Sequence, residues 1–142
     1  LDADPLQVSA FANRKKHTDP ACIREETCIA NLRFPDEILC SLTAGFVTEG
    51  GFPAWNIEIL GTGGLLAMRP GDGTPGEMTV YRDGEARVLT FTRAGFAEQS
   101  HAFLDALHGD NRCRNTPAMT LPDLRVAEAI VDSAREHRTV TL

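Results

Sequence analysis

Residues 120–142 read TLPDLRVAEAIVDSAREHRTVTL, and this final stretch decides the fold. Thr120 and Asp123 have the spacing of a capping box, and Pro122 is tolerated in a first helical turn. Apolar residues then recur at helical spacing, with charged residues opposite them. The expected inner face comprises Leu124, Ala127, Ile130, Val131 and Ala134. Residues 139–142 alternate like a short strand, and a helix that ends in a strand needs a sheet to pack against.

Seven strand-like runs precede this ending and supply the sheet. They cover residues 6–13, 26–34, 38–48, 55–60, 65–68, 78–82 and 86–92. Pro35-Asp36-Glu37 is expected to form a turn with Pro35 at its first corner, and Asp83-Gly84 is a strong hairpin signal. Residues 94–108 are typical of a helix that stops at Gly109. Its expected buried face contains Phe96, Ser100, Phe103, Leu104 and Leu107.

This order of strands followed by helices predicts an α+β domain. We expect a mostly antiparallel, open-faced β-sheet with two C-terminal helices packed on one face. The other face would carry small and polar residues such as Thr27, Ser41 and Thr43. We expect that face to be solvated, or covered by another copy or another domain.

Length and charge limit the possible functions. The chain has 142 residues, which fits one domain, and its formal net charge of −6 argues against binding to nucleic acid. No apolar run approaches the roughly 20 residues of a membrane span, and no signal-peptide pattern is present. Cys22, Cys28, Cys40 and Cys113 form no C-x-x-C pair. Reduced thiols in a cytoplasmic protein are favoured over a zinc site from Cys22, Cys28, Cys113 and His17, because that spacing matches no known ligand pattern.

Four patterns suggest chemistry, but each has a simpler interpretation. The glycines of residues 61–64 lead into another strand, so a tight turn is favoured over a phosphate loop. His101, Asp105 and His108 share one helical face, which is expected to face solvent rather than hold a metal. Serines 41, 100 and 133 lie inside regular elements rather than at a strand-turn-helix elbow. Neighbouring carboxylates such as Glu25 and Glu26 are expected to be solvated.

Phe52, Trp55 and Asn56 are the candidate substrate-facing residues. A single Trp beside a Gly-Gly-Phe-Pro loop is suited to stack on a sugar or nucleoside ring. The competing interpretation is that Trp55 belongs to the core at a strand end, since large aromatic side chains are usually well buried.

The chain resembles the C-terminal domain of the Gfo/Idh/MocA oxidoreductases, which include glucose–fructose oxidoreductase and inositol 2-dehydrogenase. The resemblance rests on Phe96, Phe103-Leu104-Asp105-Ala106-Leu107, Ala129-Ile130, residues 133–138 and Val140-Thr141-Leu142. Further matches are Glu26-Thr27, Leu32-Arg33-Phe34, residues 57–62 and Gly64. Two positions depart from the family pattern: His137 stands where a left-handed Gly is usual, and Pro35-Asp36-Glu37 replaces an Asn/Asp-Gly turn.

The resemblance implies an excised C-terminal domain spanning residues 1–142, because the chain begins with Leu1 and lacks the family's Rossmann domain, Glu-Lys-Pro segment and Asp-x-x-x-His helix. No catalytic, metal or cofactor residue is therefore assigned. NAD(P) is implied only for the full-length parent, which would oxidise a sugar, polyol or related hydroxy compound. This domain would line the substrate and form a homo-oligomer, a dimer or tetramer, through the open sheet face. A non-catalytic regulatory or ligand-binding module with the same fold is the alternative.

Overall fold

A computed structural model describes residues 3–14, 26–45, 56–69, 76–91, 95–109 and 116–142. These residues form eight strands, two α-helices and one short 3-10 segment. The chain divides into two compact units, Leu1–Gly50 with Asn115–Leu142 and Gly51–Arg114. No helix in the described part of the chain combines the length and hydropathy needed to cross a membrane.

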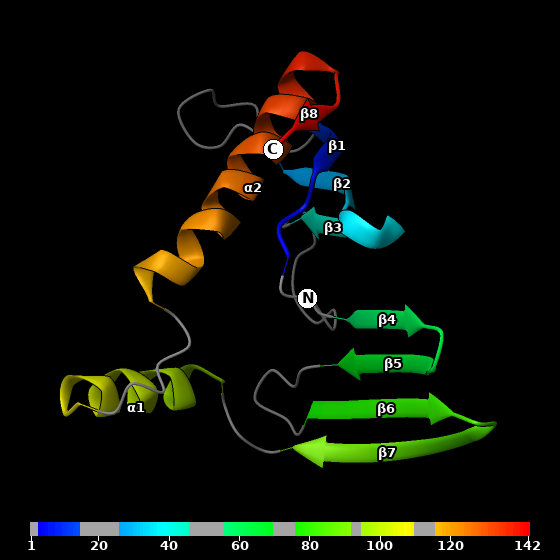
Figure 1. Cartoon of the computed structure of the whole chain (residues 1–142), viewed down its shortest axis with the longest axis vertical. Coiled ribbons are helices and arrows are strands. Elements are labelled where there is room, and N and C mark those ends of the chain that lie inside the picture. Colours follow the sequence, from blue (N-terminus) through cyan, green and yellow to red (C-terminus); the bar gives the residue numbers. More distant parts are fainter. Residues whose placement is uncertain (1–2, 15–25, 46–55, 70–75, 92–94, 110–115) are drawn as a thin grey trace. The chain divides into compact units, whose positions relative to one another are not determined.

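The first unit contains a four-stranded antiparallel sheet in the order β3-β2-β1-β8 (Figure 1). Its strands are β1 (Gln7–Asn13), β2 (Thr27–Arg33), β3 (Leu39–Gly45) and β8 (Val140–Thr141). The register pairs Ala10 with Ala30 and Ala30 with Leu42. The predicted alternation is confirmed, because Val8, Ala10, Ala30 and Leu32 point to one face and are buried there.

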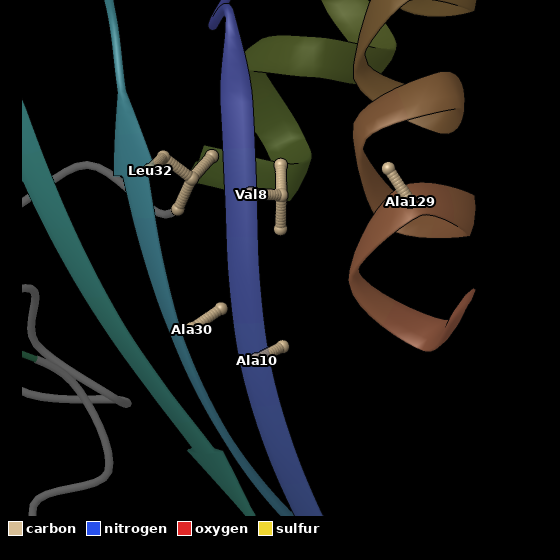
Figure 2. Packing of buried hydrophobic residues seen from close by; sticks show 5 residues of the cluster. All are labelled: Val8, Ala10, Ala30, Leu32 and Ala129. Atoms are coloured by element: carbon tan, nitrogen blue, oxygen red, sulfur yellow. The ribbon is translucent and has the colours of Figure 1, made fainter. Parts of the chain in front are cut away.

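Helix α2 (Pro117–Glu136) covers that face and completes the core. Figure 2 shows Ala129 on α2 facing β1, beside Val8. Val8 and Ala30 have no exposed surface, and Ala129 is 5% exposed. Three of the five buried residues are alanines, so the helix backbone approaches the strands closely. The predicted α+β class is confirmed.

Helix α2 begins one turn earlier than the sequence pattern predicted. Thr116 is the N-cap, its hydroxyl accepts a hydrogen bond from the Met119 amide at 3.4 Å, and Pro117 occupies the first turn. The predicted capping box of Thr120 and Asp123 is therefore wrong. The Thr120 hydroxyl instead donates to the Thr116 carbonyl at 3.2 Å. Thr116 followed by Pro117 is as good a helix N-cap as Thr120, and the helix that starts there accommodates Pro122 in its interior.

The buried face of α2 is also rotated from the prediction. Ile130 and Ala134 pack against the core as expected, but Leu124 is 56% exposed and Val131 36% exposed. The positions nearest the sheet are Ala129 and Ser133. The helix has two apolar stripes, and close approach to β1 selects the one with small side chains.

The second unit contains a four-stranded antiparallel sheet in the order β4-β5-β6-β7, together with helix α1. The elements are β4 (Ile57–Gly61), β5 (Gly64–Arg69), β6 (Gly76–Arg82), β7 (Glu85–Phe91) and α1 (Gly95–Leu107). All four strands are joined in sequence order, as hairpin connections require. Phe103, Leu104 and Leu107 are 58%, 50% and 66% exposed, so the prediction that this stripe of α1 is buried is wrong. Helical periodicity identifies an apolar stripe but does not determine what covers it.

Left-handed residues form two of the hairpin turns. Asp83 and Gly84, with φ of 53° and 81°, connect β6 to β7 as predicted. Between β2 and β3 the left-handed residues are Asp36 and Glu37, with φ of 57° and 59°. The Ile38 amide donates a hydrogen bond to the Pro35 carbonyl at 3.3 Å, so Asp36 and Glu37 are the two central residues of the turn. Pro35 precedes them, and the prediction that it occupies the first corner is wrong. Since neither Asp36 nor Glu37 is a glycine, each costs about 1 kcal/mol.

Candidate functional site

The predicted substrate-facing residues lie just before the second sheet. Asn56 is exposed and immediately precedes β4. Phe52 and Trp55 lie outside the described residues. The substrate-facing role of all three residues therefore stays a prediction.

The β4–β7 sheet has one almost wholly apolar face. The register aligns Ile57, Met68, Met78 and Leu89 in one row across the four strands. Ile59, Leu66 and Val80 form the next row, and Arg87 ends it. We name these two rows the apolar face. A surface of this composition has to be covered in a stable protein.

The opposite face of the same sheet is mixed, and we name it the mixed face. One row runs through Leu60, Leu65, Tyr81 and Ala86, and the next through Glu58, Ala67, Thr79 and Val88. Leu60 is 84% exposed, Val88 58% and Tyr81 46%. Large apolar side chains interleaved with polar ones are typical of an interface between folded proteins.

A shallow hollow of about 460 Å³ lies at the turn end of this sheet. The turns between β4 and β5 and between β6 and β7 contribute Thr62, Asp83 and Gly84, and Tyr81 adds its ring. Arg82 Nε lies 3.4 Å from Asp83 Oδ2, and both side chains are largely exposed. Side chains this exposed to solvent do not form a preorganised ligand site. The segment 61–64 is thus part of a hairpin, as predicted, and does not have the strand-to-helix geometry that holds a dinucleotide phosphate.

The uncovered face of the first sheet is mostly polar. Ser9, Asn31 and Ser41 form one row across β1, β2 and β3, and Gln7 and Arg33 pair in the row beside it. Phe11 pairs directly with Ile29, and these side chains are 68% and 47% exposed. Thr27, Ser41 and Thr43 share this face, as the sequence predicted.

The histidine face of α1 does not gather a metal site. His101, Asp105 and His108 are all exposed, as predicted. His108 Nδ1 lies 2.8 Å from the Leu104 carbonyl oxygen, so its ring is held against its own helix. Within the described ranges, no group of three or more His, Cys, Asp or Glu side chains is placed to bind a metal. Cys28 is half-buried in β2 and Cys40 exposed in β3, while Cys22, Cys113 and His17 lie outside those ranges.

Sequence reasoning missed two buried polar residues, Glu26 and Ser133, each 1% exposed. Glu26 was predicted to be solvated, and that prediction is wrong. It precedes β2 and has the same alternation as Cys28, Ala30 and Leu32, so it points to the side that α2 covers. This period-two position was the available signal. The sequence placed Ser133 inside a regular element and in the family-like segment 133–138, but did not predict that its hydroxyl forms hydrogen bonds inside the structure.

Solved structures of bacterial oxidoreductases have a similar fold. An aldose–aldose oxidoreductase from Caulobacter crescentus, solved with glycerol, has a TM-score of 0.79 at 20% identity over 99% of this chain and 42% of its own. An oxidoreductase from Agrobacterium radiobacter, solved with NAD+, L-tartaric acid and magnesium, has a TM-score of 0.68 at 21% identity over 97% and 43%. An NAD-binding protein from Listeria innocua has a TM-score of 0.64 at 18% identity over 99% and 42%.

The present chain therefore spans less than half the length of each of these relatives. At these identities the likeness establishes the fold alone. A search of curated proteins found no match. The family model for the C-terminal alpha/beta domain of the Gfo/Idh/MocA oxidoreductases matches residues 1–142, the whole chain. The chain belongs to this oxidoreductase family.

Proposed function

We propose that this chain is the substrate-side and assembly domain of an NAD(P)-dependent oxidoreductase acting on a sugar, polyol or related hydroxy compound. The observation that carries the proposal is the family match over all 142 residues. Glycerol and L-tartaric acid, present in two structures of similar fold, are hydroxy compounds of this class. The exposed Asn56 before β4, with Phe52 and Trp55 upstream of it, is the proposed substrate-facing segment. A cytoplasmic location, where thiols stay reduced, is part of the proposal and is supported by the free thiols of Cys28 and Cys40.

The glycine-rich turn between β4 and β5 does not fit the phosphates of a nicotinamide cofactor. The glycine-rich segment 61–64 closes a β-hairpin, so its amides do not converge at a helix N-terminus as dinucleotide binding requires. The proton and hydride chemistry is accordingly assigned to parts of the parent protein other than this domain. The role left to this chain is to orient the substrate and exclude water.

Cofactor titrations test this division of roles. The isolated chain is expected to give only heats of dilution when NAD+, NADH, NADP+ or NADPH is added in a calorimeter, because the glycine-rich turn at residues 61–64 does not have phosphate-binding geometry. The natural protein that carries this domain is expected to bind one of them and to reduce it with a sugar or polyol. Micromolar binding by the isolated chain would contradict the assignment. Absence of cofactor binding by the natural protein would instead identify a non-catalytic module.

The same proposal assigns self-association to the mixed face. Large apolar side chains interleaved with polar ones on this face favour contact with another folded chain. Leu60, Tyr81 and Val88 are all exposed there and offer large contact area. A second copy presents the same residues, as a two-fold interface requires. We therefore propose a dimer or tetramer built through the mixed face, rather than through the open face of the first sheet that carries Thr27, Ser41 and Thr43.

Leu60→Glu is expected to weaken self-association by about 100-fold or more, because it buries an unpaired charge in the interface. Analytical ultracentrifugation of the chain measures this directly. Leu60 is 84% exposed, so the substitution should leave the fold intact. Leu121→Glu on α2 is the control, since Leu121 is 50% exposed and Arg125 lies one turn away as an ion-pair partner. A monomeric wild-type chain, or equal effects of the two substitutions, would rule out this interface.

A further inference from the structure

The C-terminal residues 138–142 are attached to the edge of β1 by few backbone bonds. Strand β8 contains only Val140 and Thr141, which pair with Val8 and Gln7. The Leu142 amide adds one hydrogen bond to the Leu6 carbonyl at 3.1 Å. By contrast, β1 pairs with β2 along the whole of its length. The last strand is thus the most weakly paired strand of its sheet.

Ser133 extends this short ladder by one step. In the register that pairs Val8 with Val140, the residue opposite Ala10 is Arg138, two positions along each chain. The Ala10 amide donates to Ser133 Oγ at 2.9 Å, and Ser133 Oγ donates to the Arg138 carbonyl at 2.6 Å. The hydroxyl therefore takes the place of a direct amide-to-carbonyl bond between the two strands. It satisfies two backbone groups that would otherwise be buried without partners.

The residue that joins α2 to this segment is strained. His137 is the C-cap of α2, with φ of 54° and ψ of 39°. A non-glycine residue adopts this left-handed conformation only at a cost, and release of the segment would relieve it. Val140, which is half-buried beside the core, is the main apolar contact that opposes release.

We propose that residues 138–142 open and close as a separate unit on the β1 edge, and that the Ser133 hydroxyl holds the unit closed. Opening breaks the Ser133 bridge and the two-residue pairing, while the β1–β2–β3 pairing and the body of α2 stay folded. Such openings occur at lower free energy than global unfolding, because few buried contacts are lost. The opened state exposes the backbone groups of β1 that β8 covers.

Native-state hydrogen exchange on the 142-residue chain tests this. Ser133→Ala is expected to speed exchange of the Leu142 amide about tenfold, although that amide does not contact Ser133. Leu32→Val, a core truncation in β2, should speed exchange of the β2 amides and leave Leu142 unchanged. Ser9→Ala, on the uncovered face of β1, is the matched control and should change neither.

Two results would overturn the proposal. One is an unchanged Leu142 rate in Ser133→Ala, which would mean that the hydroxyl does not hold the segment. The other is an equal acceleration of Leu142 and β2 amides in Leu32→Val, which would mean that the segment opens only on global unfolding. If Ser133→Ala does not fold, His137→Gly carries the test. It should slow Leu142 exchange about fivefold by relieving the left-handed strain, and no slowing would refute the proposal.

Discussion

Gly64→Ala is expected to disrupt the β4–β7 sheet. Gly64 begins β5 with φ of 142°, a conformation that side-chain-bearing residues rarely adopt. A Cβ at this position would lie 2.1 Å from the Tyr81 carbonyl oxygen of β6. That oxygen is backbone within a paired strand, so it cannot move without breaking the Leu65–Tyr81 pairing. The combined strain and lost pairing amount to about 3 kcal/mol or more.

Gly63→Ala is the matched control for this substitution. Gly63 is the preceding residue in the same turn, and a Cβ there would meet no atom within 4 Å. Its substitution should change the free energy of unfolding by about 0.5 kcal/mol or less. Urea denaturation followed by circular dichroism compares the two variants. Equal stabilities of Gly64→Ala and Gly63→Ala would contradict the close approach of β5 and β6.

Glu26→Ala is expected to destabilise the first unit by about 3 kcal/mol or more. Glu26 is 1% exposed, and a carboxylate buried to this extent is retained only where hydrogen bonds or an opposite charge compensate it. Truncation removes that compensation for its partner and leaves a cavity beside β2. Its backbone amide, which donates to the Asn13 carbonyl at 2.9 Å, is unaffected by the change. The effect therefore reports on the side chain.

Two further variants separate charge from shape. Glu26→Gln keeps the volume and removes the charge, so a loss close to that of Glu26→Ala would assign the stabilisation to the ionised group. Glu128→Ala on α2 is the exposed control and should cost about 0.5 kcal/mol or less. The midpoint and slope of urea unfolding give the comparison. If Glu26→Ala is as stable as Glu128→Ala, the burial of this carboxylate contributes nothing to folding.

The two hairpin turns show how well local sequence predicts backbone conformation. The hairpin predicted at Asp83-Gly84 is confirmed. Both residues tolerate positive φ, and this tolerance is a local property of the residues themselves. At Asp36-Glu37 the same backbone conformation occurs without a glycine. There the pairing of β2 with β3, which extends from Arg33 and Leu39 to Thr27 and Gly45, fixes the turn against local preference. A turn of this kind is determined by the sheet and not by its own residues.

Helix α2 shows the same limit for packing. Its charged positions Arg125, Glu128 and Asp132 are exposed as predicted. The choice between its apolar stripes was not predictable, because hydrophobicity favours Leu124 and Val131 while close approach to β1 favours Ala129. Side-chain size decides which stripe of α2 is buried only when the helix packs against β1, and the helix sequence does not contain that surface.

The sequence by itself determined the order and type of the elements, the alternating faces of the strands and the family resemblance, since all of these depend on short-range periodicity and on residue identity. Only the tertiary structure decided that Glu26 is buried and that Ser133 bridges Ala10 to Arg138. The Ser133 bridge joins residues 123 positions apart in the sequence, so no local pattern encodes it. The alternation of β2 indicates which face Glu26 shares, but only the packing of α2 decides that this face is covered.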